Sequence, residues 1–122
     1  MNSFEDLEVW KSARNFRNKV LALSVTFPIE EKRRLADQII RSSRSVTANL
    51  AEGFGRFHHQ ENIQFCRTAR GSLNETLDHL ICALDCNYIN SDSFSIMKAD
   101  HDQCLKLLNG YIAYLKRAKE AL

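Results

Sequence analysis

Residues 9–27 read VWKSARNFRNKVLALSVTF, and the spacing of the apolar side chains in this stretch decides the fold. Apolar residues recur at alternating intervals of four and three: Val9, Ala13, Phe16, Val20, Leu23 and Phe27. This interval keeps side chains on one face of an α-helix. Ser3, followed three residues later by Asp6, resembles a capping box, and Pro28 stops the segment. The sequence therefore predicts an amphipathic helix that begins after Ser3 and ends at about Thr26.

Three further helices are predicted by the same reasoning. The second has acidic residues in its first turn, at Glu30 and Glu31, and continues to about Glu52. Its expected core face consists of Leu35, Ile39, Val46 and Leu50. Small residues beside this face should permit the close approach of another helix: Ser42, Ser43, Ser45, Ala48 and Ala51.

The third helix is predicted from near Gln60 to near Asn87, and its stripe consists of Leu73, Leu77, Leu80 and Leu84. The fourth helix follows a cap at Asn90, Ser91 or Ser93. It keeps a seven-residue repeat through Met97, His101, Cys104, Leu108, Tyr111, Leu115, Ala118 and Leu122. Four helices joined by short connections predict an all-α, antiparallel up-down-up-down four-helix bundle, with residues 1–122 as a single domain.

The composition fits this fold and excludes several classes of protein. One Pro and four Gly in 122 residues are too few for a many-stranded β fold. No apolar run has the length of a membrane span, and the N-terminus does not resemble a signal peptide, so we expect a cytoplasmic protein without a membrane partner. In a reducing compartment the four cysteines should be free thiols. The net charge of +2 means that any nucleic-acid role must come from a local patch.

A local excess of arginine lies in the middle of the chain. Between residues 41 and 70 five arginines face two acids, a local balance of +3. Arg44 and Arg56 are candidates for exposed contacts to phosphate, because the guanidinium fork can bind two oxygens. Arg34, His58 and His59 complete the candidate nucleic-acid-binding set. The alternative is an internal network of ion pairs with a solvated face.

The segment NLAEGFGRFHH, residues 49–59, raises a separate question, because Glu52 lies where the helix dipole disfavours an acid. Arg41, Arg67 or Arg70 could pair with Glu52 and offset that position. On this interpretation the segment is mainly structural: Gly53 ends the helix in a left-handed conformation, Gly55 allows a tight turn, Phe54 packs into the end of the bundle and Asn49 binds the backbone of the loop.

A second stripe on the third helix consists of Glu75, His79, Cys82 and Cys86. Histidine and cysteine are zinc ligands, but one helix rarely supplies a closed tetrahedral site, so a subunit interface is the better interpretation and no metal is expected. Neither a nucleophile with a positioned base nor a phosphate-binding glycine loop is present. We therefore expect no enzymatic activity, no catalytic residues and no cofactor.

Three segments together resemble a known family: FEDLEVWKSA, FPIEEKRRLADQIIRSSRSVTANLAEGFGR and ARGSLNETLDHL. They look like the four-helix-bundle family of 23S rRNA intervening-sequence proteins, whose members are encoded in insertions within bacterial rRNA genes and elsewhere in genomes. Two departures are visible: Cys86 and Asn87 stand where the family often has Leu-Gly, and His58 and His59 follow the signature arginine.

The resemblance implies a ring-like homopentamer and a fold similar to the accessory protein of diversity-generating retroelements, which engages a reverse transcriptase and nucleic acid. The expected function is therefore that of a non-enzymatic, oligomeric protein that binds RNA or DNA, or assists a reverse transcriptase, through an arginine-rich patch. The alternative is a scaffold for protein–protein interaction whose arginines are structural.

Overall fold

The computed structural model describes residues 2–121, and within that range all regular structure is helical. The four long helices are α1 (Glu8–Ser24), α2 (Leu35–Phe54), α3 (His59–Asp85) and α4 (Ser91–Glu120). Two short 3₁₀ turns, η1 (Phe4–Asp6) and η2 (Ile29–Glu31), precede α1 and α2. The predicted all-α, four-helix fold is confirmed.

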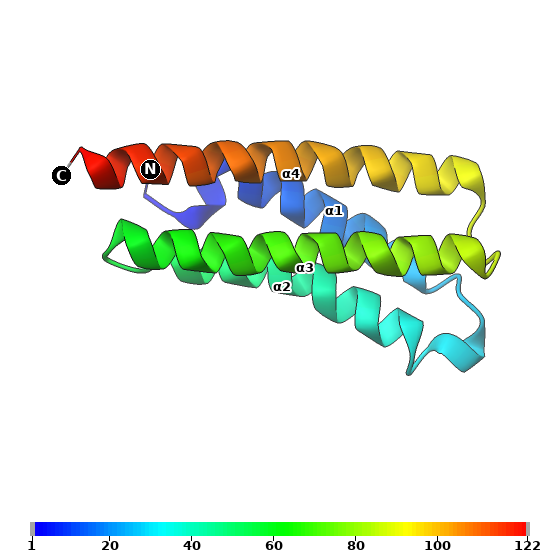
Figure 1. Cartoon of the computed structure of the whole chain (residues 1–122). Helices are drawn as coiled ribbons and strands as arrows, with labels where there is room; N and C mark the ends of the chain where they lie inside the picture. The colour runs from blue at the N-terminus through cyan, green and yellow to red at the C-terminus, as the bar shows by residue number, and fades with distance from the viewer. Residues whose placement is uncertain (1, 122) are drawn as a thin grey trace.

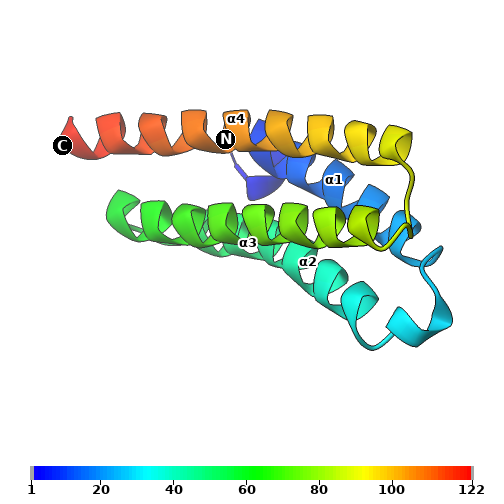
Figure 2. The same ribbon diagram turned by 45° about the vertical axis from the view of Figure 1, so that its right-hand side comes forward.

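The helices run alternately in opposite directions, so that both termini lie at the same end of the bundle (Figure 1). Each helix packs against its neighbours in sequence, and α1 closes the ring by packing against α4. The first half of α2 diverges from α3, as Figures 1 and 2 both show. This divergence leaves the start of α2 and the adjacent part of α1 less covered than the rest of the bundle.

The core is built from the predicted faces of α1 and α2, whereas on α3 Leu73 and Leu80 of the predicted stripe are buried and Leu77 and Leu84 are only half-buried. Phe16 and Val20 of α1, Ile39 and Leu50 of α2, and Leu73 of α3 are each at most 1% exposed. Burial of apolar surface on this scale is the main favourable contribution to folding. On α4 the predicted repeat is buried at Met97, His101, Cys104, Leu108 and Leu115. Tyr111 and Ala118 are only half-buried, Ile112 is buried instead, and Leu122 lies outside the described residues.

The starts of the first two helices differ from the predictions. Ser3 accepts a hydrogen bond from the Glu5 N–H (3.1 Å) and caps η1, so α1 begins only at Glu8. After Pro28 the chain forms η2 and bends at Arg34, whose φ of −124° and ψ of −106° lie outside the helical range. The second helix therefore starts at Leu35, after the predicted acidic turn of Glu30 and Glu31, and Leu35 is buried.

The connection between α3 and α4 shows why Asn87 is compatible with the fold. Asn87 has a φ of 60°, the left-handed conformation in which asparagine is tolerated best after glycine. The Tyr88 N–H donates to the Ala83 carbonyl (2.9 Å) and the Asn87 N–H to the Leu84 carbonyl (3.0 Å), the pair of bonds that closes a Schellman motif. Asn90 then caps α4 by accepting a hydrogen bond from the Ser93 N–H (2.8 Å).

The small residues of α2 serve a contact within the chain. Ser42 Oγ lies 2.8 Å from Thr76 Oγ1, and the Ser72 hydroxyl donates to Ser45 Oγ over 2.9 Å. Both pairs link α2 to α3. The small side chains of Ser42 and Ser45 thus permit the close packing of α2 on α3.

None of the helices within residues 2–121 combines the length and the apolarity needed to cross a membrane.

The four cysteines are free thiols in two environments. Burial raises the pKa of Cys66 to about 12 and that of Cys104 to about 11. Cys82 is exposed on α3, and Cys86 is exposed at the C-cap of the same helix. Desolvation is the main reason that the pKa of Cys82 is also raised, and its neighbour Cys86 adds to the effect.

Because the thiolate is the reactive form, the two pairs should be distinguishable by chemical modification. We expect a disulfide reagent at pH 8 to modify Cys82 and Cys86 in the folded protein, and Cys66 and Cys104 only after unfolding in denaturant. The absorbance of the released thiol counts the modified cysteines. Reaction of all four at one rate in the folded protein would contradict this arrangement of the core.

Candidate nucleic-acid interface

Four arginines surround one hollow at the start of α2, here called the arginine hollow. It has a volume of about 510 Å³ and is lined by Arg33, Arg34, Arg41 and Arg44 together with Asp37, Gln38 and Ile40. Four guanidinium groups against one carboxylate give a local balance of 4 − 1 = +3. The hollow is therefore a concentrated positive site on a chain whose net charge is only +2.

These arginines are not neutralised by the rest of the described chain. The ion pairs within residues 2–121 all lie elsewhere, and none includes Arg33, Arg34, Arg41 or Arg44. All four are exposed, and the start of α2 is the end at which the helix dipole disfavours cations. Arg34, the N-cap residue, thus adds its charge to the positive end of α2 at a cost to local stability, while Arg41 and Arg44 lie further along the helix.

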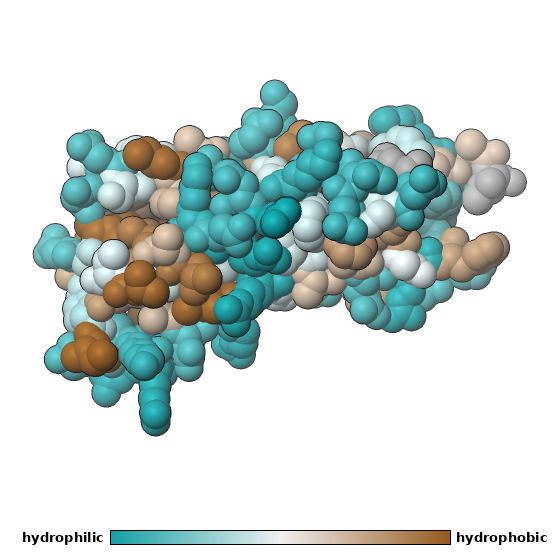
Figure 3. Space-filling model, turned by 180° about the vertical axis from the view of Figure 1, so that it is seen from behind, coloured by the Kyte–Doolittle hydropathy of each residue, from teal (hydrophilic) through white to brown (hydrophobic). Residues whose placement is uncertain are grey.

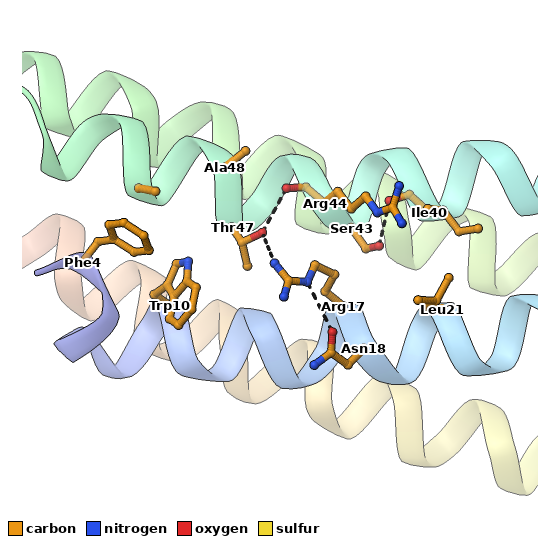
Figure 4. A pocket seen from close by; sticks show the side chains of 11 residues that line it. Phe4, Trp10, Arg17, Asn18, Leu21, Ile40, Ser43, Arg44, Thr47 and Ala48 are labelled. Carbon is orange, nitrogen blue, oxygen red and sulfur yellow. Dashed lines mark hydrogen bonds between the residues drawn. The ribbon is translucent and has the colours of Figure 1, made fainter.

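A second hollow, here called the α1–α2 groove, adjoins the first and shares Ile40 and Arg44 with it (Figure 4). Its volume is about 510 Å³. The side chains that line it are Phe4, Trp10, Arg17, Asn18, Leu21, Ile40, Ser43, Arg44, Thr47, Ala48 and Ala51. Two arginines and no acidic residue contribute to this lining, so the groove is positive as well.

Arg17 crosses the α1–α2 groove and is held there by neutral partners. Its Nη1 donates to Thr47 Oγ1 of α2 (3.0 Å), and its Nε donates to Asn18 Oδ1 (3.4 Å) (Figure 4). Trp10 lies at one end of the groove, with its ring edge-to-face with Phe4 at 5.2 Å. The guanidinium of Arg14 lies over the same indole at 5.8 Å.

The predicted nucleic-acid-binding set does not form one patch. Arg34 and Arg44 belong to the arginine hollow, but Arg56, His58 and His59 lie beyond the other end of α2. The twelve residues from Arg44 to Arg56 correspond to about 18 Å at ~1.5 Å per helical residue. His58 and His59 line a separate small hollow with Phe57, Gln60 and Lys119.

The partner of Glu52 is Arg56, so the prediction that Arg41, Arg67 or Arg70 pairs with it is wrong. Arg56 Nη2 lies 2.8 Å from Glu52 Oε1 and Nη1 lies 3.7 Å from Glu61 Oε2, while its guanidinium covers the ring of Phe65 at 4.8 Å. The physical reason is local, because α2 ends at Phe54 and the turn that follows, with the Arg56 N–H donating to the Gly53 carbonyl (3.1 Å), keeps Arg56 beside Glu52.

The other arginines of that prediction lie elsewhere. Arg70 Nη1 donates to Asn109 Oδ1 of α4 over 2.9 Å, Arg41 lines the arginine hollow and Arg67 is exposed on α3. Arg56 is therefore the arginine that pairs with Glu52. Arg41, which was predicted to have that structural role, lines the arginine hollow instead.

Gly53 and Asn49 also differ from their predicted roles. Gly53 is buried inside α2, which extends to Phe54, and no glycine among the described residues has a positive φ. A Cβ at Gly53 would lie 2.6 Å from Asn62 Oδ1 and 2.8 Å from Phe65 Cβ, so the glycine is there to let α3 approach. Asn49 donates to the Ser45 carbonyl (2.8 Å) within α2 instead of binding the loop.

The remaining glycine and aromatic residue of the motif lie at the end of α2. Gly55 is the C-cap of α2, with a right-handed φ of −74°, and Phe54 is partly buried against the core as predicted.

The geometry of the Glu52–Arg56 ion pair predicts that replacing Glu52 has only a small effect on the stability of the fold. Both side chains of the Glu52–Arg56 pair are well exposed, and exposed pairs contribute about 0.2–1 kcal/mol. We expect Glu52→Ala to lower the free energy of unfolding by less than about 1 kcal/mol in urea denaturation, and Arg41→Ala to change it by less than about 0.5 kcal/mol. A loss of several kcal/mol on replacing Glu52 would instead indicate the buried network that the sequence suggested.

The second stripe of α3 is exposed at Glu75, Cys82 and Cys86 and half-buried at His79. His79 Nε2 lies 3.1 Å from Glu75 Oε2, while Cys82 and Cys86 are exposed one and two turns further on. Within residues 2–121 no three His, Cys, Asp or Glu side chains come together as a metal site would require.

An apolar area lies where α1 ends and α2 begins, next to the arginine hollow (Figure 3). Val25 and Ile29 are each 76% exposed there. They border a further hollow of about 360 Å³, whose lining includes Phe27, Pro28 and Ala36. The periodicity of the sequence placed Val25 and Ile29 near a helix end, but it did not show that their side chains would be exposed to solvent.

Two arginines of the site were missed from the sequence. Arg33 belongs to the run Lys32-Arg33-Arg34, and Arg33 and Arg44 are eleven residues apart, so they share a helical face if the helix is extended backwards. This spacing could have identified Arg33 from the sequence. No local pattern could have identified Arg17, because Thr47, which accepts its hydrogen bond, is thirty residues away in the sequence.

The fold and the site define a small antiparallel four-helix bundle with an unneutralised basic surface along its second helix. The chain belongs to the family of 23S rRNA-intervening sequence proteins, whose model matches residues 5–110. A crystal structure of a protein of unknown function from the S23 ribosomal protein family of Bacteroides thetaiotaomicron is similar, with a TM-score of 0.78 and 24% identity over 85% of this chain and 97% of that one. At that identity the likeness shows the fold alone. No curated protein matches.

Proposed function

We propose that this protein is a non-enzymatic nucleic-acid-binding protein that holds the backbone of an RNA or DNA strand in the arginine hollow. The single observation that supports this function is the group of Arg33, Arg34, Arg41 and Arg44 around one hollow with one acid, Asp37. Unneutralised guanidinium groups are the side chains best suited to phosphate.

Self-association is the second part of this proposal. Val25 and Ile29 are large apolar side chains left exposed beside the arginine hollow, and such areas commonly mark protein interfaces. A ring of copies, a homopentamer as the family resemblance implies, would repeat the arginine hollow around one axis. Linked sites raise the effective concentration, so contacts that are weak in one copy would act together. Light scattering should give a multiple of 14.1 kDa, and a mass of one chain at micromolar concentration would contradict assembly.

The binding proposal is tested with a fluorescein-labelled 20-nucleotide RNA and a pair of double variants. Arg41→Gln/Arg44→Gln removes two charges from the arginine hollow. Arg67→Gln/Arg117→Gln removes two charges from exposed positions that do not line it. Fluorescence anisotropy at low salt should show a loss of affinity of about tenfold or more for the first variant and little change for the second.

Equal losses in the two variants would mean that only net charge matters, and absence of binding by the parent would refute the proposal. In the second case the function favoured by the exposed Val25 and Ile29 is a protein–protein scaffold. A reverse transcriptase or another protein is then the expected type of partner, and the apolar area is its expected contact.

A further inference from the structure

The α1–α2 groove differs from the arginine hollow in having apolar walls and a fixed charge. Arg17 is half-buried and its position is set by Thr47 and Asn18, which are both neutral. A guanidinium group has five N–H donors. Those not used by Thr47 and Asn18 remain available to an anionic or carbonyl oxygen, in a place where no acidic side chain competes.

Flat and apolar side chains lie on both sides of Arg17. Trp10 and Phe4 are at one end of the groove and Leu21 and Ile40 at the other, with Arg17 between them (Figure 4). Trp10 lines the groove and is only half-buried, so part of its indole is accessible beside the guanidinium of Arg14 that lies over the ring. A ligand suited to these walls carries an aromatic or apolar part together with a negative charge or a polar oxygen.

An unpaired nucleotide has this combination, and the position of the groove connects it to the phosphate site. The arginine hollow and the α1–α2 groove share Arg44 and Ile40, so a strand whose phosphates lie on Arg34 and Arg41 passes the mouth of the groove. Aromatic side chains beside a basic track are the usual means of holding single strands, because every base has a face that can stack. In a duplex the bases are already stacked and paired.

We propose that the α1–α2 groove receives the base of one unpaired nucleotide against Trp10, with Arg17 binding an oxygen of that nucleotide, and that it thereby makes the protein prefer single strands. This inference rests on the proposed function, since the phosphates of the same strand occupy the arginine hollow. The groove then supplies recognition of the base, and the hollow supplies most of the electrostatic attraction.

The test compares two labelled 12-mers of equal charge, oligothymidylate and an abasic strand with the same phosphates and no bases. Trp10 is the only tryptophan of the chain, so its emission reports on the groove directly. We expect oligothymidylate to bind about tenfold more tightly than the abasic strand and to quench Trp10, because one stacked base contributes on that scale. The abasic strand should leave the emission unchanged.

Two isosteric variants separate the groove from the total charge. Asn18→Asp places a carboxylate beside Arg17 in the groove, whereas Asn15→Asp adds the same charge at an exposed position of α1 outside it. The preference for oligothymidylate over the abasic strand should fall toward unity in Asn18→Asp and persist in Asn15→Asp. Circular dichroism of both variants shows whether the helices are intact.

The possible failures are distinct. Equal binding of both 12-mers without a change in Trp10 emission, while Arg41→Gln/Arg44→Gln still weakens both, would overturn the inference and leave the proposed function standing. No binding of either strand by the parent at low salt would overturn both. If Asn18→Asp changes the molar mass in light scattering and leaves the preference unchanged, the groove is an interface between copies and the inference is wrong.

Discussion

Replacing Arg33, Arg34, Arg41 and Arg44 together with glutamine should lower the affinity for a single-stranded RNA by about 100-fold at low salt. Hydrogen bonds to charged groups contribute up to ~1.5–3 kcal/mol each, and exposure to water reduces that value, so four contacts give an effect of this order. The melting temperature should stay the same or rise slightly, because the variant removes mutual repulsion and unfavourable charge near the start of α2. Anisotropy and thermal denaturation measure the two quantities separately.

The matched control replaces four exposed cations that do not line the arginine hollow: Arg67, Lys106, Lys116 and Arg117. It lowers the net charge equally. We expect less than a tenfold loss of affinity, from reduced long-range attraction alone. If both quadruple variants lose affinity equally, binding is a property of the total charge and the arginine hollow has no special role.

The second large effect concerns stability, and we expect Gly53→Ala to destabilise the bundle by about 1–3 kcal/mol. A Cβ at this position would lie 2.6 Å from Asn62 Oδ1, and Asn62 donates to the Tyr111 hydroxyl (3.1 Å). The new methyl group must push α3 away or break this contact, and overpacking of a tight interface costs energy of that size. Thermal denaturation should show a fall in melting temperature of several degrees.

Gly71→Ala is the control, because Gly71 also lies inside a helix but a Cβ there would meet nothing within 4 Å. It should stabilise the protein by about 0.5–1 kcal/mol, the ordinary gain from replacing a helical glycine. The variant Gly53→Ala/Asn62→Ala should lose less stability than the sum of its two single changes, because the clash is relieved. An increase in stability in Gly53→Ala alone would contradict the close packing of α2 on α3.

The sequence predicted the helices well wherever apolar spacing decided them. Val9, Phe16 and Val20, and Ile39 and Leu50, are buried as the intervals indicated. Helix ends were less predictable, because Leu35 and Asn87 adopt their positions through turns whose geometry depends on nearby packing. Gly53 was misplaced for the same reason, since the approach of Asn62 and Phe65 is a contact between helices that local rules do not contain.

The candidate site was only partly predictable. Arg34 and Arg44, which were predicted to belong to one basic set, do line the same hollow, but the sequence did not show that Arg56 pairs with Glu52. Local spacing would have shown this pair had α2 been extended past Gly53. The α1–α2 groove could not be predicted at all, because Arg17 and Thr47 meet only when two helices pack.

The central claim is that the arginine hollow binds phosphates, and the salt dependence of binding tests it most directly. For single strands the slope of log K against log salt concentration is about −0.7 for each phosphate neutralised. Measured with the same RNA, the variant that lacks Arg33, Arg34, Arg41 and Arg44 should have a slope shallower than that of the parent by about 3. Equal slopes for parent and variant would show that these arginines contact no phosphate and would contradict the account.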